Sequence, residues 1–265
     1  MIQMINGKRL SLLAVSVILL IIYSSFTFQE NGDDIVAQQS SAQEGLQIDS
    51  DIYNVESIVD FPENQTVSGG DVMSSFSKDD WNLILVNKQH PLSEDFPVEL
   101  GLISGTMECD ERIIEDWYAM KEAAAEDGVT IIVASPYRAY DRQVYLFDKK
   151  VKSYMSQGMN YLESYKNASQ IVNIPGCSEH QTGLALDIIS DTHSKLNEAF
   201  AKTDAGKWLA KHCQEYGFIL RYPKGKEYVT SIDYEPWHFR YVGEEAATII
   251  MEEGITLEEF IERLG

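Results

Sequence analysis

The sequence is poor in cysteine and in basic residues. Only three cysteines occur among 265 residues, no CxxC motif is present, and the odd count argues against a disulfide framework. Lys and Arg number 21 against 42 Asp and Glu, which gives a net charge of −21. Because phosphate binding requires clustered basic side chains, this balance argues against a nucleic-acid partner. The HExxH motif is also absent, so the chain is not a zincin-type metallopeptidase.

One long apolar run stands near the N-terminus. Residues 10–28 carry no charge, are long enough to span a bilayer and follow the basic residues Lys8 and Arg9. Basic flanks stay on the cytoplasmic side, so the rest of the chain is expected outside the cytoplasm. We expect an uncleaved, single-pass signal anchor over residues 1–28 in the cell membrane, because no clear cleavage site follows the run. A cleaved signal peptide, which would give a secreted protein, is the alternative.

The remainder divides into a tether and a folded domain. Residues 29–75 are polar and acidic with poor hydrophobic periodicity, which predicts a flexible tether, and residues 76–265 form the predicted domain. Apolar runs and turn residues predict strands at 82–88, 129–135 (a central strand), 183–189, 218–222 and 238–242. Helical spacing and caps predict helices at 110–127, 141–155, 160–172 and 204–216, and two near the C-terminus, the second beginning with a capping box at Thr256. No regular βαβ rhythm appears, so the fold class is α+β.

One Asp stands inside an apolar run, in the segment CSEHQTGLALDI. Successive side chains of a strand point to opposite faces, so Asp187 is expected on the face opposite to Leu186 and Ile188. His180 lies in the preceding loop, and Gly183 permits a sharp backbone path that would bring the imidazole toward Asp187. Imidazole and carboxylate are both zinc ligands. A purely structural hydrogen bond between the two side chains is the alternative, and this segment alone leaves both open.

A third ligand is expected from the segment YEPWHFRYVG. His238 stands there among aromatic residues, close after Glu235, and Pro236 favours a bend that would bring both side chains to one site. A carboxylate beside a metal-activated water is the usual general base in hydrolysis, so His238 would be a ligand and Glu235 the base. The donor set suits Zn²⁺ without excluding Mn²⁺ or Fe²⁺. The other histidines are expected at the surface or in helix packing: His90, His193 and His212.

The segment SPYRAYDRQVYLF follows the predicted strand at 129–135 directly. Sites are often built at strand ends, where Arg138 would stabilise an oxyanion or hold a substrate carboxylate. Gln143, in the first turn of the next helix, would add a hydrogen bond. The alternative is an arginine at a helix start that pairs with Asp141 or another surface acid.

Three segments together resemble the VanY-type D-alanyl-D-alanine carboxypeptidases, which belong to the zinc peptidase group that also holds lysostaphin-like enzymes and hedgehog domains. They are SPYRAYDRQVYLF, SEHQTGLALDI and YEPWHFRYVG. The second fits the family pattern SxHxxGxAxD, and the third fits ExWH. The resemblance spans roughly residues 81–242 and therefore excludes the apolar run and the tether.

The resemblance implies a small, mainly antiparallel sheet flanked by helices, and one Zn²⁺ per chain. The implied zinc ligands are His180, Asp187 and His238. Glu235 would be the base and Arg138 would stabilise the intermediate. Residues near the substrate would be Ser178, Gln143 and Trp237, and for Trp237 packing beneath its strand is an equal alternative. The implied substrate is a peptidoglycan stem peptide or precursor, from which a terminal D-Ala leaves.

Several alternative functions stay open at this point. L,D-carboxypeptidase and endopeptidase activity on the same stem share this metal chemistry, and related folds carry zinc in non-catalytic binding domains. A binding domain that recognises cell-wall fragments would not need Glu235 and Arg138. A serine D,D-peptidase is disfavoured because the SxxK sequence at Ser75 lies at the edge of the tether, without KTG or SxN partners.

Overall fold

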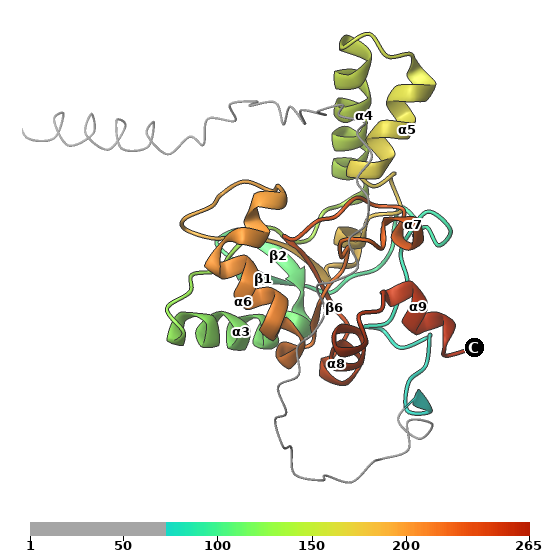
Figure 1. Cartoon of the computed structure of the whole chain (residues 1–265). Helices are drawn as coiled ribbons and strands as arrows, with labels where there is room; N and C mark the ends of the chain where they lie inside the picture. Colours follow the sequence, from blue (N-terminus) through green and yellow to red (C-terminus); the bar gives the residue numbers. More distant parts are fainter. Residues whose placement is uncertain (1–72) are drawn as a thin grey trace, which may run out of the picture. The chain divides into compact units, whose positions relative to one another are not determined.

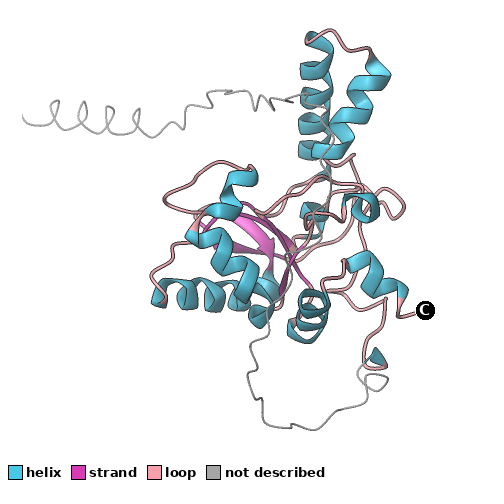
Figure 2. Ribbon diagram, viewed as in Figure 1, coloured by secondary structure: helices cyan, strands magenta, loops and turns pink. Residues whose placement is uncertain are grey.

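A four-stranded antiparallel sheet lies at the centre of the domain that the computed structural model describes, residues 73–265 (Figure 1). Its strands, in spatial order, are β3 (Ile132–Ser135), β4 (Ala185–Ile189), β6 (His238–Tyr241) and β5 (Phe218–Leu220). A separate hairpin pairs β1 (Leu100–Ser104) with β2 (Met107–Asp110). Helices surround the strands (Figure 2), so the predicted α+β fold with a small antiparallel sheet is confirmed.

The helices begin and end largely where local chemistry predicts. Asp110 accepts a hydrogen bond from the Arg112 amide and so begins the first helical segment, and capping boxes at Asn160 and Thr256 begin α5 and α9. The α-helices are α3 (Ile114–Glu126), α4 (Tyr140–Ser156), α5 (Tyr161–Ile171), α6 (Asp204–His212), α7 (Glu227–Thr230), α8 (Glu244–Glu253) and α9 (Leu257–Glu262). The 3-10 helices are η1 (Glu111–Ile113), η2 (Glu179–Thr182), η3 (Glu198–Lys202) and η4 (Cys213–Tyr216).

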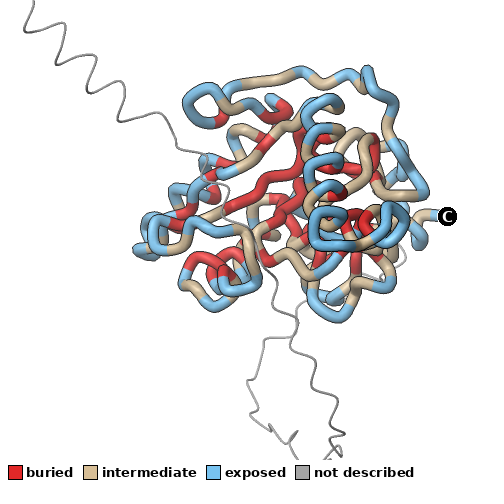
Figure 3. Tube along the Cα trace, turned by 90° about the horizontal axis from the view of Figure 1, so that it is seen from above, coloured by how far each residue is buried: buried red, intermediate tan, exposed pale blue. Residues whose placement is uncertain are grey.

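Strand alternation gives the sheet one apolar face. Leu186 and Ile188 of β4 and Phe239 of β6 are buried in the main core, together with side chains of α3 and α6. Buried segments concentrate in the interior of the domain, with exposed segments around them (Figure 3). Ile219 of β5 points to the other face and joins a second core with α8 and α9. Helices α4 and α5 form a hairpin with a small core of their own (Figure 1).

Two predictions about strands are wrong. Residues 82–88 form no strand, and of them only Asn87 takes part in an isolated bridge, with His90 just beyond the segment. The physical reason is that the carbonyl oxygens of Asn82 and Ile84 accept hydrogen bonds from the Arg240 guanidinium, whereas strand pairing would need a neighbouring backbone. Strand β3 lies at the edge of the sheet and not at its centre, because within residues 73–265 it pairs with β4 alone. The β1–β2 hairpin was not predicted.

The predicted anchor at 1–28 and most of the predicted tether at 29–75 lie outside the described residues. Within residues 73–265, no helix combines the length and apolar character that a membrane crossing requires. All three cysteines belong to this part of the chain, and each is a buried free thiol: Cys109, Cys177 and Cys213.

Candidate metal centre

Asp187 and His238 face each other across two neighbouring strands. They are register partners in the antiparallel pair β4–β6, so their side chains leave the sheet on the same face. The Asp187 Oδ1 atom lies 3.1 Å from the His238 Nδ1 atom, and both residues are buried. Despite burial, the two neighbouring histidines hold the pKa of Asp187 well below its usual range. A carboxylate and an imidazole are thereby fixed side by side.

His180 reaches the same point from η2. The chain turns from η2 into β4 at Gly183, whose φ of +73° is left-handed. A Cβ atom at this position would lie 2.5 Å from the Asp110 amide nitrogen, so glycine is required sterically as well. The His180 Nδ1 atom donates a hydrogen bond to the Pro136 carbonyl at 2.7 Å, which leaves Nε2 facing the Asp187 Oδ2 atom at 3.3 Å. Burial lowers the pKa of His180, which favours the neutral imidazole that metals bind.

One ligand atom from each of His180, Asp187 and His238 lies within 4.8 Å of the other two. All three side chains are buried, and the donor set of two imidazole nitrogens and one carboxylate oxygen is one that Zn²⁺ accepts at catalytic sites. The Pro136 carbonyl also fixes the His180 ring, as outer hydrogen bonds usually do for metal-binding histidines. The residues therefore fit a zinc ion.

Glu235 lies beside this cluster, at the turn that leads into β6. The His238 amide donates to the Glu235 carbonyl at 3.2 Å, and this turn brings the Glu235 Oε2 atom to 3.7 Å from the His238 Nδ1 atom. The expected bend at Pro236 is present with a trans peptide bond. Burial raises the pKa of Glu235 to about 8, although His238 and Arg138 act in the opposite direction. A partly buried carboxyl group with a raised pKa is suited to proton transfer.

Arg138 completes the polar side of the cluster. Its Nη2 atom lies 3.5 Å from the Asp187 Oδ2 atom and donates to the Ser135 hydroxyl at 2.9 Å. Its Nη1 atom donates to the Gln143 side-chain carbonyl at 2.9 Å. These contacts orient the guanidinium toward the cluster, and none of them involves Asp141, the alternative partner. Burial lowers the pKa of Arg138, but the group remains a cation.

The three residues predicted near the substrate occupy different surroundings. Gln143 is fully buried, bonds Arg138 and donates to the Asn173 carbonyl at 2.6 Å, so it orients the arginine. Ser178 is buried, and within residues 73–265 its hydroxyl has no hydrogen-bond partner. Trp237 is partly buried and packs against the main core, which is the packing alternative raised above.

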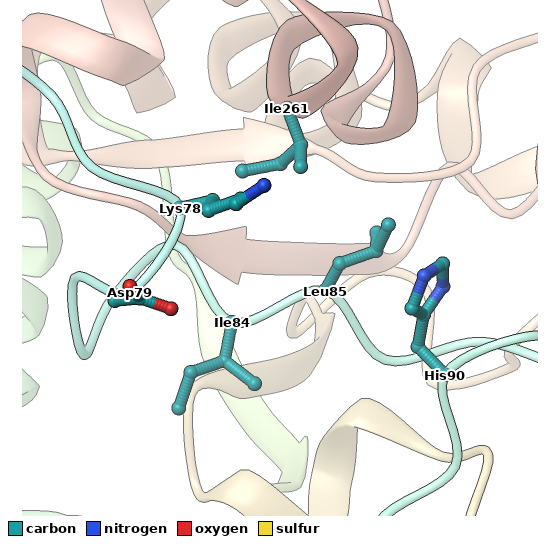
Figure 4. Close-up of a pocket in the computed structure, with 6 residues that line it drawn as sticks. All are labelled: Lys78, Asp79, Ile84, Leu85, His90 and Ile261. Atoms are coloured by element: carbon teal, nitrogen blue, oxygen red, sulfur yellow. The ribbon is translucent and has the colours of Figure 1, made fainter. Parts of the chain in front are cut away.

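The other histidines lie apart from the cluster. His193 bonds Asn197, and His212 stacks on Trp208 with ring centroids 5.0 Å apart. His90 is exposed and lines a surface hollow of about 400 Å³ (Figure 4). The other residues around this hollow are Lys78, Asp79, Ile84, Leu85 and Ile261. None of the cluster residues described above lines this hollow, so it is a separate feature of the surface.

The sequence interpretation missed a buried carboxylate on the far side of His238. The Glu179 Oε2 atom lies 3.4 Å from the His238 Nε2 atom, and its Oε1 atom accepts hydrogen bonds from Arg221 and Arg240. Tyr222 also contacts His238, with ring centroids 4.8 Å apart. The only signal for Glu179 was its position next to His180, and the two arginines look like ordinary surface residues in sequence.

A family model described as VanY, D-alanyl-D-alanine carboxypeptidase, matches residues 106–244. The D-alanyl-D-alanine carboxypeptidase of Enterococcus faecalis is 39% identical over 205 residues, which cover 77% of this chain and 74% of the relative. The chain belongs to the VanY family. The prediction of a zinc peptidase related to D-alanyl-D-alanine carboxypeptidases is thus confirmed.

Solved structures of VanY-family and related enzymes share the fold. A vancomycin resistance D,D-pentapeptidase VanY mutant in complex with Zn(II) is 42% identical with a TM-score of 0.62, covering 68% of this chain and 99% of that one. The LD-carboxypeptidase LdcB is 39% identical with a TM-score of 0.60, covering 70% of this chain and 88% of that one. Enzymes of two different specificities are therefore similar to this chain to nearly the same degree.

Proposed function

We propose that this chain is a zinc-dependent D,D-carboxypeptidase that removes the terminal D-Ala from peptidoglycan stem peptides or their precursors. One observation carries the proposal: a buried His-Asp-His group with a carboxyl group of raised pKa 3.7 Å from one of the histidines. Membership of the VanY family supports the reaction, and the Zn(II) complex of a family member supports the metal. A domain that only binds the cell wall would not need Glu235 in this position.

One zinc ion per chain would be held by His180 through Nε2, by Asp187 through its carboxylate and by His238 through Nδ1. When bound, zinc supplies Lewis acidity toward the scissile carbonyl and a water molecule. The Pro136 carbonyl keeps His180 in the required tautomer, since it accepts the proton of Nδ1.

Glu235 would act as the general base and then as the acid. Its carboxylate accepts the proton of the attacking water and passes it to the leaving amine of D-Ala. Arg138 and a divalent cation both favour the ionised form of this carboxyl group, so its pKa in the loaded enzyme would lie below the value of the free protein.

Arg138 would stabilise the oxyanion that develops on the scissile carbonyl, because its guanidinium is partly buried and held in place by Ser135 and Gln143 before substrate binds. Gln143 would act through Arg138. The Ser178 hydroxyl is buried and lacks a partner within residues 73–265, so it would contact substrate only if the surrounding side chains moved, and Trp237 would act through its packing beneath β6.

L,D-carboxypeptidase activity on a tetrapeptide stem is the second candidate, favoured by the similarity to LdcB. Purified protein beginning near residue 75 should be incubated with pentapeptide and tetrapeptide stems side by side, before and after removal of metal with a chelator. We expect one zinc per chain, release of D-Ala from the pentapeptide, and activity lost with the metal and restored by Zn²⁺. Cleavage of the tetrapeptide alone would replace the D,D assignment, and activity independent of metal would contradict the proposal.

We also propose that residues 1–28 anchor the chain in the cell membrane with the catalytic domain outside the cytoplasm. The uncharged run 10–28 behind Lys8 and Arg9 supports this orientation, and peptidoglycan lies on that side. Fractionation of cells that express the full chain, followed by protease treatment of intact protoplasts, tests it. A domain protected from protease would contradict the orientation, and a domain found only in the medium would favour the secreted form.

A further inference from the structure

The imidazole of His238 lies between two carboxylates. On one side Nδ1 is 3.1 Å from Asp187, and on the other Nε2 is 3.4 Å from the Oε2 atom of Glu179. Glu179 is completely buried, and a buried carboxylate oxygen requires a donor. Nε2–H is positioned to be that donor, and with a metal bound this contact would leave the lone pair of Nδ1 for the ion, on the side of Asp187 and His180.

Two buried arginines hold Glu179 in this position. Arg221 Nε and Arg240 Nη1 donate to the same oxygen, Oε1, at 2.7 and 2.8 Å. This arrangement leaves Oε2 for His238. Both guanidinium groups lie at hydrogen-bond distance from Oε1, and their positive charges favour the ionised carboxylate. Glu179 is therefore a fixed acceptor and does not act as a proton donor.

The arginines extend this contact to distant parts of the chain. Arg221 makes a two-pronged contact with Glu258 in the first turn of α9, at 2.8 and 2.7 Å. Arg240 donates through Nη2 to the carbonyl groups of Asn82 and Ile84. A continuous set of buried and partly buried contacts thus joins α9 to His238. Residue 258 lies beyond the stretch 106–244 that the family model matches.

We propose that Glu179 is a positioning residue of the metal centre, and that α9 holds it there through the contact between Glu258 and Arg221. This inference rests on the proposed function, because it takes His238 as a metal ligand. Glu179 fixes the tautomer and ring orientation of His238, and Glu258 fixes the arginine that fixes Glu179. Loss of such an outer partner typically weakens metal affinity or activity by about 10- to 100-fold.

Three variants of the full-length chain test this inference. In Glu179→Gln the shape is kept but the charge is removed; in Glu258→Gln the change is made at the distant end of the contacts. Glu259→Gln is the matched control, because the neighbouring Glu259 bonds Lys226 and the Thr256 amide, and glutamine also serves in a capping box. The measurements are the zinc dissociation constant by chelator competition, the absorption spectrum of the Co²⁺-loaded protein, and the unfolding midpoint of the metal-free protein.

We expect the zinc dissociation constant to rise about 10- to 100-fold in Glu179→Gln and by a smaller factor in Glu258→Gln, with an altered Co²⁺ spectrum in both. Glu259→Gln should keep the wild-type constant and spectrum, whatever its unfolding midpoint. A purely structural role would lower the midpoints without moving the spectrum.

The failures of the two proposals are distinguishable. If the wild-type chain binds no zinc, the proposed function fails. If the wild-type chain binds zinc and the folded Glu179→Gln and Glu258→Gln variants bind it equally well with an unchanged Co²⁺ spectrum, the positioning role is overturned. Should Glu179→Gln not fold, Glu258→Gln decides alone, since its side chain is 14% exposed and removal of its charge leaves Arg221 bonded to Glu179.

Discussion

The two faces of the central sheet are both covered, but by different kinds of interaction. Leu186, Ile188 and Phe239 face α3 and α6 and exclude water by apolar contact. On the opposite face, alternate residues of the same strands, Asp187 and His238, are surrounded by charged and hydrogen-bonding groups. Neighbouring residues of β4 thus face an apolar core on one side of the sheet and the candidate site on the other.

This difference indicates where stability and chemistry are located. Full burial of an aliphatic or aromatic side chain stabilises the fold by about 1.5–3 kcal/mol. Burial of charged groups carries a desolvation cost that pairing roughly offsets, so the charged groups around Asp187 and His238 should contribute little net stability. Substitutions on the two faces should therefore have different effects. Those near the site should reduce activity with little change in stability, and those in the apolar core should reduce stability with little change in kcat.

Glu235→Ala should give the largest effect of these substitutions. It should lower the rate of D-Ala release without lowering zinc content or stability. A general base contributes about 10²- to 10⁴-fold to rate, so D-Ala release should fall by that factor. Zinc content should stay at the wild-type value because Glu235 is not in the ligand set. The unfolding midpoint should hold or rise because a partly buried carboxyl group with a raised pKa is removed. Product release, metal content and thermal unfolding measured on one preparation check all three.

The exposed Asp233, two residues earlier, provides a control: Asp233→Ala should retain wild-type turnover. If Glu235→Ala turned over at near the wild-type rate, Glu235 would not be the base. If the variant lost zinc together with activity, Glu235 would be a metal ligand and not only a base.

Leu186→Ala should give the opposite result. Removal of this fully buried side chain should lower the free energy of unfolding by about 2–5 kcal/mol, from lost burial and the cavity that remains. The kcat of the folded fraction should change little, because the side chain points away from Asp187. Urea unfolding followed by assays well below the midpoint checks this.

Leu162→Ala removes a leucine that is 75% exposed and should change the free energy of unfolding by no more than about 0.5 kcal/mol. A large loss of kcat in folded Leu186→Ala would show that the two faces are coupled and would contradict the separation.

The sequence predicted the apolar face of β4 and the site residues Asp187 and His238 on β4 and β6. Alternation in GLALDII was enough to place Asp187 opposite to Leu186, and a bend at Pro236 was enough to bring Glu235 toward His238. Such features depend on period and turn chemistry, which are local properties of the chain.

The contacts behind His238 could not be predicted in the same way. Glu179, Arg221 and Glu258 are charged residues on different elements, and only the tertiary fold makes them partners. Arg240 also explains why 82–88 is not a strand, since its guanidinium binds backbone carbonyl groups of that segment. Local patterns carry no information about which buried charges will pair.

Gly183→Ala tests the turn from η2 into β4, which connects the ligand His180 to the strand that carries Asp187 and Leu186. An alanine there must adopt a positive φ and also meets the Asp110 amide nitrogen at 2.5 Å. Gly128 has nearly the same φ, +75°, with no atom within 4 Å of an added Cβ, so Gly128→Ala measures the conformational cost alone. We expect Gly183→Ala to lose about 1–3 kcal/mol more unfolding free energy than Gly128→Ala, the usual range for overpacking. Zinc affinity should fall only in Gly183→Ala, because relief of the clash displaces His180. If both variants lost the same stability and kept the wild-type zinc affinity, this turn would not position the ligand.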